Sequence, residues 1–395
     1  MYALNPLLFT GLDRSKTSLS ASLWVLAIDS GNGGRKVGIV IDASGSMEDN
    51  DPRNLRLQAA KLLVDKLISP SEVTGDQTAD EVAVIEFTHT ADVLYPLGDP
   101  SGAGPAVDGI IADGGTFIGS GVNAAIDELT KNSAAAGQTG ILVLTDGVDD
   151  PSYFTPETIA SIDRAQELGI RVSFGFLSID STQQDPEIIE AILRSGGIFA
   201  TINTADDIGK VVAQALLNGL VGEPGKTKVI LLSDVETAGM LDQTGSNTFT
   251  YTAKEGEEFN VTLTSDDRDP VSLKVTLRDP SGKEVASAVT DPDTGVAFVE
   301  YTAQAAGTIT IEITPEGNKK SGLFSVKLLS SLDPCAESPV QIPPSNSTYI
   351  PTQSYHPPSP TGTSVVTAAA APMGNANLAV GFGLLLLPTV FGVLY

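Results

Sequence analysis

The first half of the chain alternates short apolar runs with segments of helical period. Apolar, β-branched runs predict strands at Val37–Asp42, Val82–Phe87, Asp92–Leu97 (an edge strand), Ile141–Thr145, Arg171–Leu177 and Ile198–Ile202. Apolar residues recur at helical spacing from Leu55 and from Ile118. Thr155 and Asp185, each followed by proline, predict two helix N-caps, and Thr204 is predicted to start the last helix. Alternating strands and helices predict an α/β fold with a doubly wound, mostly parallel sheet covered on both faces.

In the second half, apolar and polar residues alternate in several short segments, which is the pattern of strands buried on one face. Short strands are predicted at Val229–Leu232, Thr248–Thr252, Phe259–Thr264, Ser272–Leu277, Val296–Tyr301, Thr308–Ile313 and Leu323–Leu328. Turn sequences such as Asp279-Pro280-Ser281-Gly282 separate these runs. The pattern predicts an all-β, antiparallel sandwich.

The composition changes again after the predicted sandwich. Residues 333–372 hold nine prolines, many Ser and Thr, and charge only at Asp333 and Glu337. We expect an extended stalk there, because such a segment has too few apolar side chains to form a core. The five predicted parts are an N-terminal segment (1–34), an α/β domain (35–222), a β-sandwich domain (226–332), the stalk (333–372) and an apolar tail (373–395).

The two ends of the chain bear on its location. Leu378 to Tyr395 is uncharged and apolar, and the small residues before it resemble the layout of a glycosylphosphatidylinositol attachment signal. The alternative is a tail anchor inserted after synthesis, with all preceding residues in the cytosol. The segment before residue 35 is compatible with a weak signal peptide, a strand or a truncated start. Sequons at Asn260 and Asn346 mark candidate glycosylation sites if the chain is exported.

The overall charge argues against nucleic acid as a partner. A formal net charge of −26 argues against nucleic acid, since binding to phosphates needs clustered Lys and Arg. The sequence has one cysteine, Cys335, and two histidines, His89 and His356, so an internal disulfide and a multi-Cys zinc site are excluded.

The most informative segment is Val37 to Met47, where a buried strand leads directly into polar residues. Asp42, Ser44 and Ser46 follow the apolar run, and two later segments offer Thr116 and Asp146. Carboxylate and hydroxyl oxygens in such a cluster are the ligands that hard cations such as Mg²⁺ and Ca²⁺ prefer.

This D-x-S-x-S pattern, with the later Thr and Asp, resembles the metal-ion-dependent adhesion site of von Willebrand factor type A (vWA) domains. The resemblance implies a Rossmann-like sheet of strand order 3-2-1-4-5-6, with Asp42 and Asp146 on neighbouring strands. It implies Ser44, Ser46 and Thr116 as direct ligands of Mg²⁺ or Ca²⁺, and the two aspartates as direct or water-mediated ligands. It also implies that an acidic residue of a partner protein completes the coordination. We interpret the flanking Glu48, Asp49, Asp149 and Asp150 as solvated loop charge.

The domain order suggests a second resemblance. Gln58-Ala59-Ala60-Lys61, the Gly114 to Gly121 segment and the later Asp279-Pro280-Ser281-Gly282 turn resemble calcium-activated chloride channel regulators. Those proteins also carry a metalloprotease domain with an H-E-x-x-H helix, and this sequence contains no such motif. Self-cleavage is therefore not implied.

Other chemical signals are weaker. The Gly119 to Ala124 segment partly matches a dinucleotide-binding fingerprint, but it does not directly follow a strand, and close packing at a helix start explains its glycines better. An enzyme using the metal as a Lewis acid lacks a convincing base or nucleophile. We therefore expect a non-enzymatic, cation-dependent adhesion or protein-binding protein held at the cell surface by a lipid anchor. The alternative is a tail-anchored scaffold that faces the cytosol.

Overall fold

The computed structural model describes residues 34–131, 137–177, 184–222, 229–241, 245–265, 271–317 and 322–332. Residues 1–33, the stalk with Cys335 and Asn346, and the apolar tail lie outside the described residues. Among the described residues, no helix is both long and apolar enough to cross a bilayer.

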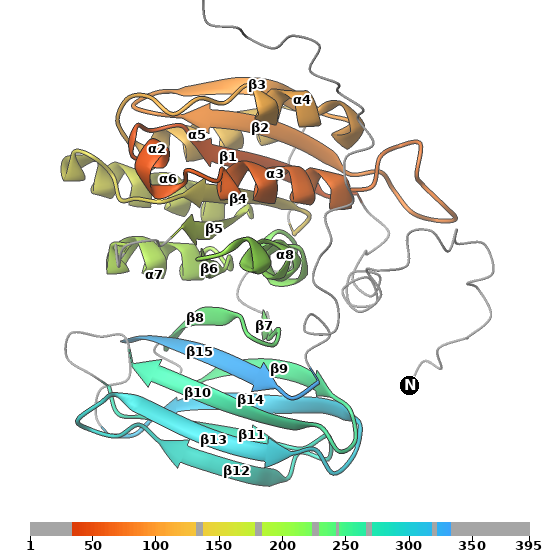
Figure 1. Ribbon diagram of the computed structural model, residues 1–395, viewed down its shortest axis with the longest axis vertical. Helices are drawn as coiled ribbons and strands as arrows, with labels where there is room; N and C mark the ends of the chain where they lie inside the picture. The colour runs from red at the N-terminus through yellow and green to blue at the C-terminus, as the bar shows by residue number, and fades with distance from the viewer. Residues whose placement is uncertain are drawn as a thin grey trace, which may run out of the picture. The chain divides into compact units, whose positions relative to one another are not determined.

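The α/β half contains a single six-stranded sheet, drawn in red to green in Figure 1. Its strands are β1 (Lys36–Asp42), β2 (Glu81–Phe87), β3 (Ala91–Gly98), β4 (Thr139–Thr145), β5 (Arg171–Leu177) and β6 (Phe199–Ile202). Their spatial order is β3-β2-β1-β4-β5-β6, which confirms the predicted order. All neighbours pair in parallel except β2 and β3, which pair antiparallel. The predicted doubly wound sheet with an edge strand is therefore present.

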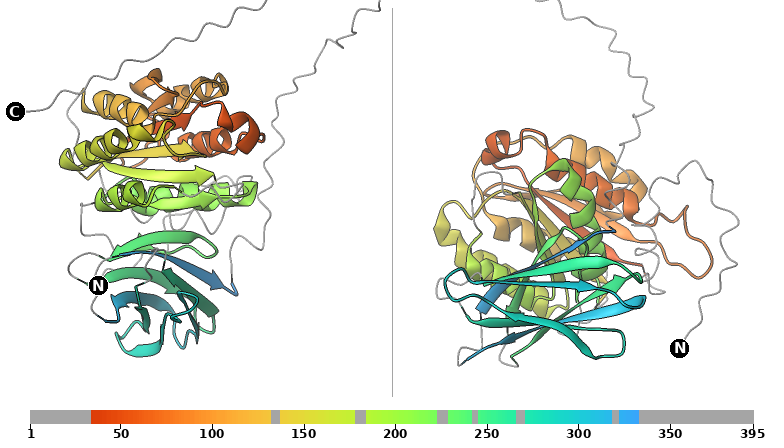
Figure 2. Two further views of the ribbon diagram at one scale, coloured as in Figure 1. Left: turned by 90° about the vertical axis from the view of Figure 1, so that its left-hand side faces the viewer. Right: turned by 60° about the horizontal axis from the view of Figure 1, so that its bottom comes forward.

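Helices cover both faces of this sheet, and the turned view in Figure 2 shows the layers. The helices are α2 (Ser46–Asn50), α3 (Leu55–Lys66), α4 (Gly104–Asp108), α5 (Ile118–Thr130), α6 (Thr155–Glu167), α7 (Pro186–Arg194) and α8 (Ala205–Gln214). Short 3₁₀ turns η2 (Pro100–Gly102) and η3 (Ser152–Phe154) and a π-helical turn η4 (Ala215–Gly219) complete the set. Alternate residues of β1 serve the two cores: Ile39 packs with α3, α4 and α8, whereas Val40 packs with α5, α6 and α7.

The helix ends follow local sequence signals, with one correction. Asp185 caps α7 by accepting a hydrogen bond from the main-chain N–H of Glu187 at 2.9 Å. Thr204 caps α8 in a capping box with Asp207. Thr155 is not the N-cap of α6 but its first residue, because the turn η3 runs directly into the helix.

The glycines at the start of α5 serve close packing, as predicted. A Cβ at Gly121 would lie 2.5 Å from Cγ1 of Val40, and one at Gly119 would lie 3.0 Å from Cα of Thr158. These glycines allow α5 to approach β1 and α6 closely, which places the beginning of α5 beside the end of β1.

The second half is a sandwich of two sheets around its own apolar core. Its strands are β7 (Val229–Ile230), β8 (Glu236–Leu241), β9 (Asn247–Ala253), β10 (Glu258–Ser265), β11 (Leu273–Arg278), β12 (Glu284–Val289), β13 (Val296–Thr302), β14 (Gly307–Pro315) and β15 (Gly322–Ser330). One sheet has the order β13-β10-β15-β8 and the other β12-β11-β14-β9-β7. All pairs are antiparallel except the two-residue pairing of β7 with β9.

The sequence missed two strands of the sandwich. β8 contains Gly239, and β12 carries only small and β-branched apolar residues between polar ones, so neither forms a strong apolar run. Gly239 has a packing reason, since a Cβ there would lie 2.4 Å from the ring of Phe324. The candidate glycosylation residue Asn260 lies on β10, opposite Glu300 of β13 and Leu329 of β15, and is half-buried.

Candidate metal site

The two candidate carboxylates lie at the same edge of the sheet. Strands β1 and β4 are parallel neighbours, with Ile41 opposite Leu144. The two strands therefore end side by side, and Asp42 and Asp146 lie at these two ends. Asp42 is fully buried and Asp146 is 2% exposed. The fold therefore brings together the two aspartates that the sequence places more than a hundred residues apart.

Asp42 is a buried carboxylate held by neutral donors. One of its oxygens accepts the main-chain N–H of Ser44 at 2.8 Å, and the other accepts the hydroxyl of Thr145 at 2.5 Å. Burial raises the pKa of Asp42 to about 6, although the hydrogen bonds from Ser44 and Thr145 oppose that shift. Thr145 is a contact that the sequence did not single out. A bound cation would offset the cost of burying this charge.

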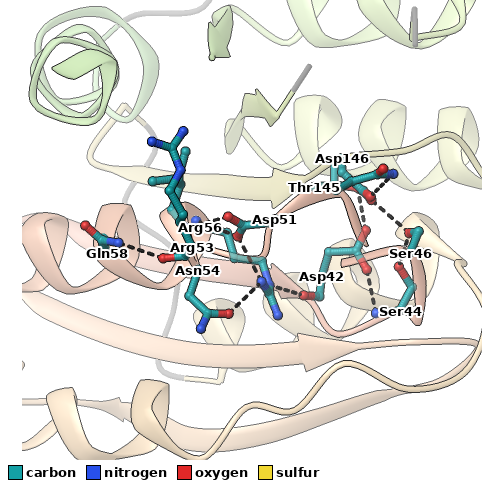
Figure 3. A network of polar contacts seen from close by, with 12 residues as sticks. Asp42, Ser44, Ser46, Asp51, Arg53, Asn54, Arg56, Gln58, Thr145 and Asp146 are labelled. Carbon is teal, nitrogen blue, oxygen red and sulfur yellow. Dashed lines mark hydrogen bonds and ion pairs between the residues drawn. The ribbon is translucent and has the colours of Figure 1, made fainter. Parts of the chain in front are cut away.

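The remaining predicted ligands of the β1 and β4 loops form a chain of polar contacts (Figure 3). The hydroxyl oxygens of Ser44 and Ser46 lie 3.0 Å apart. Ser46 donates to Oδ1 of Asp146 at 3.1 Å, and Asn50 donates to Oδ2 at 2.7 Å. Burial raises the pKa of Asp146 as well, against the hydrogen bonds from Asn50 and Ser46.

Thr116 belongs to a third loop, which main-chain hydrogen bonds fasten to the other two. On one side, the N–H of Gly45 donates to Gly114 O at 3.0 Å, and the N–H of Asp113 donates to Ala43 O at 2.7 Å. On the other side, Thr116 and Asp150 form an antiparallel bridge, in which Asp150 N–H donates to Thr116 O at 2.9 Å. Thr116 is buried and lies in a loop attached to both carboxylate-bearing loops.

A buried ion pair stabilises the loop after β1. Arg56, at the start of α3, donates to the carboxylate of Asp51 and to the main-chain oxygen of Asp42, each at 2.8 Å. Asp51 also accepts the main-chain N–H groups of Leu55 at 2.6 Å and Arg56 at 3.1 Å, so its carboxylate binds free N–H groups of the first turn of α3, although the N-cap residue is Asn54. Figure 3 shows this pair beside the candidate ligands. Sequence reasoning missed it because an arginine at a helix start is ordinarily exposed.

Asp149 corrects one sequence interpretation. Glu48, Asp49 and Asp150 are exposed, as expected of loop charge, but Asp149 is only 2% exposed. Its carboxylate accepts the main-chain N–H of Ile118 at 2.8 Å, at the beginning of α5. Burial raises its pKa, against this hydrogen bond. Asp149 therefore fixes the helix that follows Thr116, and its charge is not solvated.

The donors assembled here suit a hard cation. They are carboxylate and hydroxyl oxygens, from Asp42, Asp146 and the nearby Ser and Thr residues, and they include no sulfur or imidazole. Among the residues that the structure describes, no group of three or more His, Cys, Asp or Glu is placed so that it could hold a metal ion by itself, so a metal here would also need hydroxyl ligands. Oxygen-only donor sets are those of Mg²⁺ and Ca²⁺.

Two family models match the chain. Residues 37–148 match the von Willebrand factor type A domain, and residues 233–323 match the filamin/ABP280 repeat. The first range includes all five candidate ligands.

Several known proteins are similar in part. A stretch covering 46% of this chain is 27% identical over 190 residues to the uncharacterized protein YfbK of Escherichia coli K12. That match spans only about a third (31%) of YfbK.

Solved structures resemble the chain at low identity. The vWA protein of Catenulispora acidiphila is 18% identical, with 75% of this chain and 62% of that chain covered and a TM-score of 0.37. Proximal thread matrix protein 1 of the mussel byssus, solved with a zinc-occupied metal-ion-dependent adhesion site, is 21% identical, with 49% and 48% covered and a TM-score of 0.39. The matched family models and the observed topology together show that the chain combines a von Willebrand factor type A domain with a filamin-like β-sandwich domain.

Proposed function

We propose that the vWA domain binds one divalent cation, Mg²⁺ or Ca²⁺, and through it an acidic side chain of a partner protein. The observation that carries this proposal is the Asp42 carboxylate, which is fully buried beside Ser44, Ser46 and Asp146 with neutral donors around it. A carboxylate buried in this way is stabilised most effectively by a cation.

Each candidate residue has a defined part in this proposal. Ser44, Ser46 and Thr116 would hold the ion directly, and Asp42 and Asp146 would hold it directly or through water. When bound, the ion supplies a Lewis-acidic position that an incoming carboxylate can complete. Because most of the proposed direct ligands are neutral hydroxyls, the ion would keep part of its positive charge and an open position for a further anion. vWA domains are typically interaction modules, and we propose a non-enzymatic role here.

We further propose that the protein acts at the cell surface, where the filamin-like domain and the Pro/Ser/Thr-rich segment hold the vWA domain away from a lipid anchor. The support is the layout of residues 333–395, which resembles a stalk followed by an attachment signal. The alternative is a tail-anchored scaffold with the same metal site facing the cytosol.

Carboxylate recognition can be tested with immobilised short peptides that carry a fixed central aspartate, beside a matched set with asparagine. We expect the full chain to bind the aspartate set in Mg²⁺ and to lose binding in EDTA, on the asparagine set, and in Asp42→Ala. The control is Asp49→Ala, which removes an exposed carboxylate near the site. Equal binding to both sets, or binding that survives EDTA, would refute the proposal.

Location is tested separately on intact cells treated with a phosphatidylinositol-specific phospholipase. Release of glycosylated protein into the medium supports the surface anchor. Retention of unglycosylated protein that becomes accessible to protease only after lysis supports the cytosol-facing scaffold.

A further inference from the structure

Four aromatic side chains gather beside the candidate metal site, and we call them the aromatic ledge: His89, Phe117, Tyr153 and Phe154. Phe117 stacks on Phe154 with ring centroids 4.4 Å apart and an interplanar angle of 16°. The ring centroid of Tyr153 lies 4.6 Å from that of Phe154, and the ring centroid of His89 lies 6.3 Å from that of Phe154. The ledge is therefore one connected cluster drawn from three loops.

Main-chain hydrogen bonds hold the ledge next to the candidate ligands. Phe117 directly follows Thr116, and its N–H donates to Thr88 O at 2.8 Å, which joins it to the loop that carries His89. The bridge between Thr116 and Asp150 joins it to the loop that carries Tyr153. A Cβ at Gly115 would lie only 2.1 Å from Nε2 of His89, so the imidazole lies against the main chain of the Thr116 loop.

The ledge and its loops expose apolar surface at the place where a partner would arrive. Tyr153 is 69% exposed, and the same loops expose Ile111 at 78% and Val148 at 37%. Only two other large apolar residues of the described vWA domain, Val93 and Leu168, are comparably exposed. Exposed aromatic and apolar side chains gathered at one edge of a soluble domain indicate an interaction surface.

The charge of the same loops limits the chemistry of the partner. Residues 88–90, 110–117 and 146–158 contain no Lys or Arg. Besides the candidate ligand Asp146 and the buried Asp149, they carry Asp113, Asp150 and Glu157, all exposed. A partner that presents a carboxylate to the ion must cross this negative field, so further acidic groups on it are disfavoured and basic groups are favoured.

We propose that the aromatic ledge is a second recognition site, which binds a basic side chain, preferably arginine, that flanks the metal-bound carboxylate of the partner. An arginine can stack its planar guanidinium on an exposed ring such as Tyr153 while lying among exposed carboxylates such as Asp150. The partner is thus a protein segment in which an acidic residue has an arginine close by. This inference rests on the proposed carboxylate-binding function of the same domain.

The test uses the immobilised peptides with fixed central aspartate, varied at all flanking positions, in Mg²⁺ at pH 8. We expect the full chain to retain peptides with flanking arginine about three- to fivefold over the library average, with lysine weaker. Tyr153→Ser and Asp150→Asn should each reduce this preference about twofold or more, while binding still depends on Mg²⁺ and on the central aspartate.

Matched controls lie at the other end of helix α6, whose first residues follow the ledge. Leu168→Ser and Glu167→Gln remove an exposed apolar and an exposed acidic side chain there, and both should keep the arginine preference. Enrichment of aliphatic, aromatic or acidic residues instead of basic ones would overturn the proposed partner chemistry. Arginine enrichment unchanged by Tyr153→Ser would overturn the role of the ledge. Loss of dependence on Mg²⁺ or on the central aspartate would overturn the proposed function itself, which separates the two failures.

Discussion

Replacing Arg56 by methionine removes the buried cation that supports the loop after β1. Its guanidinium donates to Asp51 and to the main-chain oxygen of Asp42, each at 2.8 Å, and the side chains of the ion pair are 2% and 1% exposed. Removing one partner of such a pair leaves a buried charge and typically costs about 3–5 kcal/mol. Asp51 keeps the main-chain N–H of Leu55 as a donor, so we expect a loss of about 3 kcal/mol, at the lower end of that range.

Hydrogen exchange followed by mass spectrometry measures this loss in the full chain without assuming that the two domains unfold together. A loss of about 3 kcal/mol corresponds to roughly hundredfold faster exchange of the most protected amides of β1 and α3. Because Arg56 also holds the main chain of Asp42, we expect Mg²⁺ affinity to fall by about tenfold or more, as for other residues that orient metal ligands.

The matched control is Arg53→Met, which removes an exposed arginine from the same loop. Unchanged exchange in β1 and α3 of Arg56→Met, relative to this control, would show that the buried ion pair does not stabilise this loop. A second variant, Asp51→Asn together with Arg56→Met, removes both charges. We expect it to be destabilised by less than the sum of the two single changes, because it leaves no unpaired buried charge.

Two further predictions follow from the site and the core. In EDTA, the folded protein binds a proton at Asp42 more tightly than the unfolded chain does, since its pKa is raised from 3.8 to about 6. That stabilisation is fully present below pH 4 and is lost as the pH rises through 6, which lowers stability by about 3 kcal/mol in a series of thermal unfolding measurements. Asp42→Asn should remove this part of the pH dependence and leave the part that comes from Asp146 and Asp149, whose pKa values burial also raises. A profile that is unchanged in Asp42→Asn would contradict the burial of an ionisable Asp42. Gly121→Ala should destabilise the vWA domain by about 1–3 kcal/mol, because its Cβ would lie 2.5 Å from Val40, whereas Gly104→Ala meets no atom within 4 Å and should have little effect.

The fold of the vWA domain was largely predictable because its buried strands are continuous apolar runs. β1 and β4 are buried along nearly their whole length, so hydrophobicity alone located them. The order of the sheet came from the resemblance carried by Asp42, Ser44, Ser46, Thr116 and Asp146. The strands β8 and β12 were missed, because small residues and Gly239 weaken the alternation on which strand prediction depends.

The supporting groups of the site were not predictable from single-residue patterns. Arg56, Asp51 and Asp149 are charged residues in polar loops, and charged residues there are usually solvated. Their burial results from three loops packing at one sheet edge, which is a tertiary effect. No local helix signal marks Asp51 either, because it lies four residues before Leu55 and the N-cap position of α3 is occupied by Asn54.

A calorimetric titration of Mg²⁺ and of Ca²⁺ into the metal-free full chain measures whether the vWA domain holds a divalent cation at Asp42 and its neighbours. We expect saturable binding of one ion at the site, lost in Asp42→Ala and in Thr116→Ala and kept in Asp49→Ala. The absence of binding at neutral pH, or binding that is unchanged in Asp42→Ala, would show that these residues do not form a cation site.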